Sequence, residues 1–330
     1  MRILLKLLVA LALGLSLGGA VHAATAGLGG QRFASQDQLL QFMNTYRARP
    51  RPKLLAPAIH SMSDFGLLGD EEASGMYVGF IAGVVAGNQL KAESLIAGAL
   101  PMRPDEQAAV VKGIAYSGLP NWRSILNDFV LLMPERRILI DHYVTGQAPL
   151  LMDIPVDSGR TLDTLWGYYL ATGYYEPVQR IIGALAWSSN RDDLDKLLVG
   201  SMAKWTLATN AARDPGLLKL FYTEAAVQPE PVAKPLKDVI QAVEVAETGR
   251  IKKEALAAID ELKAKGPASK RTIAWGTELG ATAIAVGCVV AGVTGHAELG
   301  VPCVVSGALT QAAGKVLTSD SFSAKSLGFQ

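Results

Sequence analysis

The sequence predicts an all-α protein of stacked antiparallel helical hairpins, an irregular α-solenoid-like arrangement, with a Gly/Ala-rich helical hairpin near the C-terminus. Three observations lead to this prediction. Apolar residues recur at helical spacing through residues 35–227, Gly or Pro marks the breaks, and no segment alternates as a strand does. The chain has 330 residues, half of them hydrophobic and 18% charged, so it can bury a sizeable core.

Residues 1–23 have the features of a secretory signal peptide. Arg2 and Lys6 precede an apolar stretch at residues 7–17, and Val21 and Ala23 occupy the −3 and −1 positions of a cleavage site. An uncleaved membrane anchor is the alternative, but the apolar stretch is short for that role. We therefore predict cleavage after Ala23 and a periplasmic or secreted mature protein.

The mature chain is close to electrically neutral. Cleavage removes two of the 31 basic residues and none of the 30 acidic residues, which leaves a net charge of about −1 with neutral histidines. Nucleic-acid binding requires a basic surface, so no nucleic-acid partner is expected.

A flexible, Gly-rich lead-in is expected at residues 24–34, followed by the helical-hairpin domain at 35–227. Ser35 is a suitable N-cap for the first helix, and prolines at 50 and 52 end it. The expected helices cover residues 35–46, 53–65, 72–86, 92–100, 105–117 and 121–133, before an irregular connection at 143–158.

The helix expected at 72–86 carries a glycine at every fourth position. These glycines, at positions 75, 79, 83 and 87, form a smooth strip along one face. In a bilayer such a strip would be a packing surface, but the apolar run of about 14 residues is too short to span. We therefore expect a buried helix that another helix approaches closely.

A helical hairpin at residues 162–185 is the clearest building unit of the chain. Its second half, from Gly173 to Leu185, matches the segment from Gly87 to Leu100. Further matches follow at an offset of about 85–93 residues, which indicates a degenerate duplication of a four-helix block. Helix pairs of this kind bury their apolar faces by stacking on their neighbours.

The segment at 228–273 is expected to contain a Pro-rich hinge, residues 228–235, and an amphipathic, charged helix at about 236–265 with a possible interruption at Gly249. The last segment, 274–330, has two uncharged runs rich in Gly, Ala and Val. Cys288 and Cys303 lie on either side of the break between these runs, and export favours a disulfide between them.

Residues 274–318 have two interpretations. They form either a membrane-inserting or membrane-docked hairpin, or a disulfide-stapled helix pair buried against the helical body. Flotation of the mature chain with liposomes separates the two, because a buried pair would leave the protein free of the vesicles.

Few residues point to catalysis or metal binding. Ser201 and Lys204 match an S-x-x-K motif of penicillin-recognising serine enzymes, but the partner motifs are missing and an ordinary helix explains them. No His or Cys pair has metal-ligand spacing, and no cofactor is expected. Asp153, Asp157 and Asp163 could bind a cation, although they lack a Gly-centred calcium loop.

Aromatic residues are the better binding candidates. Trp166, Tyr169, Tyr174 and Tyr175 crowd the hairpin at 162–185. On a concave face they would form a groove for a peptide or glycan, whereas the alternative is packing between helices.

The segments TYRARPRPKLL, MYVGFIAGVVAGN and LDTLWGYYLATGYYEPVQRIIGAL together resemble bacterial exported helical proteins of unknown function. The resemblance spans about residues 40–190 and implies no activity. The W…Y…G…Y order from Trp166 to Tyr175 also resembles a tetratricopeptide hairpin, without the 34-residue period. The expected function is therefore a non-enzymatic scaffold of the cell envelope that binds a protein or envelope component. A membrane-associated role through residues 274–318 is the alternative.

Overall fold

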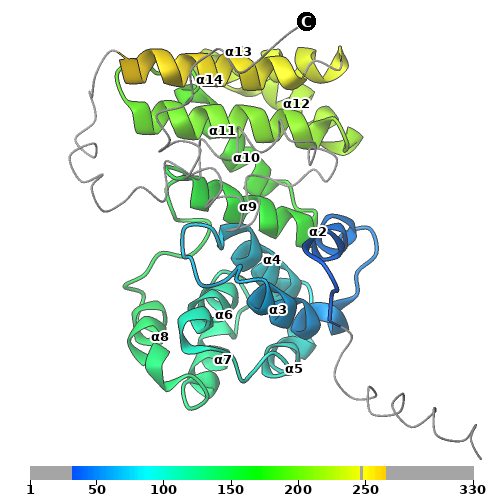
Figure 1. The fold of residues 1–330 in the computed structure, drawn as a ribbon, viewed down its shortest axis with the longest axis vertical. Helices are drawn as coiled ribbons and strands as arrows, with labels where there is room; N and C mark the ends of the chain where they lie inside the picture. Colours follow the sequence, from blue (N-terminus) through cyan, green and yellow to red (C-terminus); the bar gives the residue numbers. More distant parts are fainter. Residues whose placement is uncertain (1–31, 246–247, 265–330) are drawn as a thin grey trace, which may run out of the picture. The chain divides into compact units, whose positions relative to one another are not determined.

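The computed structural model describes residues 32–245 and 248–264, and this part of the chain is all helical (Figure 1). The α-helices are α2 (Gln36–Thr45), α3 (Leu55–Asp64), α4 (Gly75–Ala86), α5 (Ala92–Ala97), α6 (Gln107–Ala115), α7 (Trp122–Phe129), α8 (Arg137–Val144), α9 (Gly159–Thr172), α10 (Glu176–Gly183), α11 (Leu194–Ala211), α12 (Pro215–Val227), α13 (Glu230–Glu244) and α14 (Thr248–Ala264). Short 3₁₀ turns, η1 (Pro52–Leu54), η2 (Gln89–Lys91), η3 (Pro104–Glu106), η4 (Pro134–Arg136) and η5 (Ala184–Trp187), link several of them. The predicted all-α class is confirmed.

The helix ends follow the local sequence. The Ser35 hydroxyl accepts a hydrogen bond from the Gln38 N–H, as expected of an N-cap. Asp193 caps α11 in the same way, accepting from the N–H groups of Asp195 and Lys196. Gly173, at φ 74°, ends α9 in the left-handed conformation that glycine adopts without a steric penalty.

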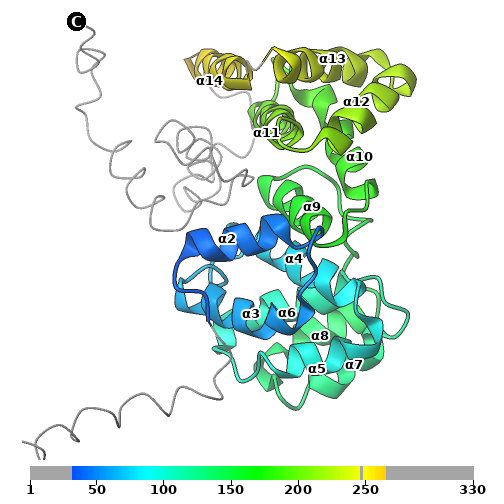
Figure 2. The ribbon, with the colours of Figure 1, turned by 90° about the vertical axis from the view of Figure 1, so that its right-hand side faces the viewer.

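The apolar core has two parts that meet where α4 packs on α9. One part is built by α2–α8, and the other by α9–α14. Helix α9 lies between α4 and α11, as both views of the ribbon show (Figures 1 and 2). The order α4–α7 followed by α9–α12 agrees with the duplication expected from the sequence, with α4 and α9 as the first helices of the two blocks.

Helices α4 and α9 run parallel, backbone against backbone. A Cβ atom built on Gly79 would lie 1.9 Å from the Thr164 carbonyl oxygen, and one built on Gly167 would lie 2.0 Å from the Met76 carbonyl oxygen. The expected close approach at the glycine strip is therefore present, and its partner is α9. This packing brings the N-terminal ends of the two helices side by side.

One expectation for the connecting segments was wrong. Residues 230–235 are not a hinge but the first turns of α13, which packs on α11 and α12. The irregular connection expected at 143–158 begins at residue 145, after the end of α8. The charged helix expected at 236–265 is divided into α13 and α14, with the break just before Gly249.

Candidate functional site

An open cavity of about 290 Å³ lies at the N-terminal ends of α4 and α9. Helices α6 and α8 and the connection before α9 complete its wall. The lining is mixed. Its apolar members are Val78, Leu139, Pro149, Leu151 and Ile154, and its polar members include Glu71, Ser74, Lys112, Tyr116, Arg160 and Thr161.

Arg180 of α10 holds the connection before α9, which forms part of the cavity wall. Its guanidinium donates a hydrogen bond of 2.7 Å to the Leu151 carbonyl oxygen and another to that of Ile154. Both carbonyls belong to residues that line the cavity. This part of the cavity wall has no helix, and a side chain of the second helical block holds it in place.

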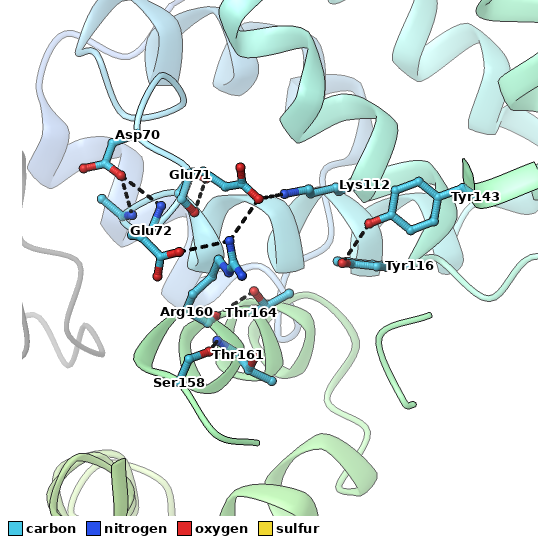
Figure 3. Close-up of polar contacts among 12 residues, drawn as sticks. Asp70, Glu71, Glu72, Lys112, Tyr116, Tyr143, Ser158, Arg160, Thr161 and Thr164 are labelled. Carbon is cyan, nitrogen blue, oxygen red and sulfur yellow. Dashed lines mark hydrogen bonds and ion pairs between the residues drawn. The ribbon is translucent and has the colours of Figure 1, made fainter. Parts of the chain in front are cut away.

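Two cations from different helices converge on one carboxylate in the cavity (Figure 3). Lys112 of α6 hydrogen-bonds Glu71 Oε1, and Arg160 of α9 places Nη1 2.9 Å from the same oxygen. The same Arg160 nitrogen lies 3.0 Å from Glu72 Oε1. The hydrogen bond from Lys112, helped by the charges of Lys112 and Arg160, holds the pKa of Glu71 below its ordinary value.

The cations and the carboxylates are held differently. Lys112 and Arg160 project from helices, and the Lys112 side chain is only 15% exposed. Glu71 and Glu72 belong to the turn before α4, and the Glu71 side chain is 62% exposed. The positive ends of the α4 and α9 dipoles face the same region and favour negative charge there.

Hydroxyl groups form the remaining polar lining. The Tyr143 hydroxyl donates to the Tyr116 hydroxyl at 2.9 Å, so the Tyr116 proton can turn to an acceptor in the cavity. Burial raises the pKa of both phenols, which keeps them protonated. The Thr164 hydroxyl donates to the Arg160 carbonyl oxygen, and that of Ser74 donates to the Glu71 carbonyl oxygen. The Ser74 and Thr164 protons are therefore already used, whereas the Tyr116 proton and the two cations suit the cavity to holding an acceptor-rich, negatively charged group.

The four aromatic residues predicted to bind a partner are not together on one surface. Trp166 and Tyr169 are buried in the core, whereas Tyr174 and Tyr175 are exposed. The expected groove is therefore not formed by these four side chains, because positions 166 and 169 of α9 face the helices packed around it. Packing between helices was the alternative, and it describes Trp166 and Tyr169.

Tyr169 has a specific structural role. Its hydroxyl donates to Asp214 Oδ2 at 2.5 Å, and Arg47 Nη2 lies 2.6 Å from the same oxygen. The Arg47 guanidinium also lies 4.8 Å from the centre of the Tyr169 ring, and the Tyr175 ring stacks on the Tyr169 ring with their centroids 6.3 Å apart. This cluster joins α2, α9 and the N-cap of α12.

The S-x-x-K residues do not form a nucleophile and its base. Ser201 is buried within α11, and the Lys204 ammonium is bound by Asp238 of α13, with Glu254 of α14 at 3.9 Å. The Lys204 side chain is largely covered by this ion-pair network. The geometry therefore favours a structural role for Lys204.

The three aspartates considered for a cation are separated. Asp163 is buried in α9, whereas Asp153 and Asp157 are exposed in the connection before it. Among residues 32–245 and 248–264, no group of three His, Cys, Asp or Glu side chains is arranged to hold a metal ion. Asp163 Oδ1 has no hydrogen-bond partner in this part of the chain, and burial raises its pKa to about 8.

Several predictions fall outside the described residues. These are the signal peptide at 1–23, most of the lead-in at 24–34, the Cys288–Cys303 disulfide and the apolar hairpin of the segment 274–330. None of the helices that the structure describes combines the length and the apolarity needed to cross a bilayer. Comparison with protein-family models, curated proteins and solved structures found no match.

Proposed function

We propose that this chain is an exported, non-enzymatic binding protein of the cell envelope, and that it holds its ligand in the cavity between α4, α6, α8 and α9. The observation that carries the proposal is the open cavity itself, whose lining combines two helix-borne cations with several apolar side chains. An apolar surface with a few convergent polar groups is the usual composition of a ligand site. The sequence supports export through the predicted signal peptide.

A binding role suits the hydroxyl groups better than catalysis does. The hydroxyls of Ser74 and Thr164 donate to backbone carbonyl oxygens of their own segments, and neither is paired with a basic side chain of the described residues. Nucleophilic catalysis requires a base within hydrogen-bond reach of the nucleophile. Membrane association through residues 274–318 is a separate proposal that rests on the sequence alone.

The proposal predicts that the protein isolated from its own cell envelope carries a small polar molecule. Denaturation should release this molecule from the wild-type protein, and mass spectrometry should detect it. A Lys112→Ala, Arg160→Ala double variant, which lacks both cations, should release none. Arg137→Ala is the control, since this substitution removes a positive charge from α8 at a residue that does not line the cavity. Equal content in all three proteins, with unchanged circular dichroism, would contradict the proposal.

A further inference from the structure

We propose that the ligand of this cavity is a small monocarboxylate with an apolar body, and that Glu71 occupies the position of the ligand's carboxylate when the cavity is free. This inference rests on the proposed function and specifies its ligand class. The carboxylate position is marked by the point where Lys112 and Arg160 meet on a single oxygen of Glu71 (Figure 3).

The location of Glu71 makes it the replaceable partner. Its side chain reaches the cations from a turn and is mostly exposed, whereas both cations project from helices. Because the Glu71 carboxylate is mostly exposed and sits on a turn, it can move into solvent and leave Lys112 and Arg160 to a ligand carboxylate. The carboxylate of the ligand would then accept hydrogen bonds from Lys112 and Arg160. Such charge-assisted bonds are stronger than bonds between neutral groups.

The charge balance favours a monoanion. When Glu71 turns away, Lys112 and Arg160 remain, and Glu72 stays 3.0 Å from Arg160. The cavity then holds one net positive charge, which a single carboxylate neutralises and a phosphate dianion exceeds. The proton of Tyr116 can reach a second acceptor, since its oxygen already accepts from Tyr143.

The apolar side chains of the lining indicate the chemistry of the ligand beyond its carboxylate. Val78, Leu139 and Leu151 face the cavity, so the part of the ligand beyond its carboxylate is expected to be apolar. The cavity of about 290 Å³ is at the lower limit of the volumes that hold small molecules. A compact aromatic or branched aliphatic acid therefore fits better than a long-chain one.

Calorimetric titration of the full mature chain with benzoate tests the proposal. We expect benzoate to bind, and its neutral isostere benzamide and inorganic phosphate to bind at least tenfold more weakly. Arg160→Ala should weaken benzoate binding at least tenfold, whereas Arg137→Ala should not change it. Glu71→Gln removes the internal competitor, so it should tighten benzoate binding by about threefold to fivefold.

The outcomes separate this inference from the proposed function. If benzoate binds neither the wild type nor Glu71→Gln, the ligand class is overturned. If the protein from the cell envelope still carries a ligand that the Lys112→Ala, Arg160→Ala variant lacks, the proposed function stands. Weaker benzoate binding by Glu71→Gln would overturn the substitute role of Glu71. Because Glu71 is exposed and lies outside the helices, this variant is expected to fold normally.

Discussion

Replacing Gly79 by alanine is expected to destabilise the protein by about 3 kcal/mol, because the added methyl group has no space. Its Cβ would lie 1.9 Å from the Thr164 carbonyl oxygen, which belongs to the backbone of α9 and cannot rotate away. Helix α9 would have to move outward along its whole contact with α4. The intrinsic helix preference of alanine, worth about 1 kcal/mol over glycine, offsets only part of this cost.

Urea unfolding measures the effect, and Gly183→Ala is the matched control. Gly183 is exposed at the end of α10, and nothing lies within 4 Å of the position its Cβ would take. The control should therefore be as stable as wild type or slightly more stable. Equal stability of Gly79→Ala and Gly183→Ala would show that α4 and α9 are not in backbone contact.

Replacing Asp163 by asparagine should remove a pH dependence of stability between pH 5 and pH 8. In the folded protein burial raises the pKa of Asp163 to about 8, whereas an unfolded chain loses this proton near pH 4. Between these values the folded state binds one proton more than the unfolded state, so its stability falls as the pH rises. The slope is at most about 1.4 kcal/mol per pH unit, or on the order of 4 kcal/mol from pH 5 to pH 8.

Asparagine has nearly the shape of the protonated carboxyl group and no charge to bury. Asp163→Asn should therefore match the wild type below about pH 4, already be somewhat more stable at pH 5, and be more stable by several kcal/mol at pH 8. Tyr77, on which the Asp163 charge acts, has its pKa raised by burial and by Asp163, so it stays protonated in this range. Asp157→Asn, at an exposed position before α9, is the control and should keep the wild-type profile.

Unfolding curves of the three proteins from pH 5 to pH 8 provide the measurement. Parallel pH profiles for wild type and Asp163→Asn would contradict the burial of a protonated carboxyl group in α9.

Local signals in the sequence predicted much of the fold. The Ser35 cap and the glycine strip of α4 each depend on neighbouring residues, and each is present in the structure. The expected hinge failed because Pro231 lies in the first turn of α13, where a missing N–H costs nothing. Pro235 lies deeper in the helix, where apolar neighbours packed against α11 and α12 compensate for it.

The candidate site was not predictable from sequence alone. Glu71 lies 41 positions before Lys112 and 89 positions before Arg160, so no short motif contains them. The glycine strip indicated that some helix approaches α4. Which helix does so depends on the tertiary packing, and in the structure it is α9. The sequence pattern favoured instead the aromatic residues at 166–175, of which Trp166 and Tyr169 belong to the core.

A crystal structure of the mature chain grown with saturating benzoate tests the central claim, that this cavity is a ligand site, most directly. The account predicts a carboxylate between Lys112 and Arg160, the ring against Leu139 and Leu151, and Glu71 turned out to solvent. Glu71 still bound to both cations, with no ligand in the cavity at saturation, would contradict it.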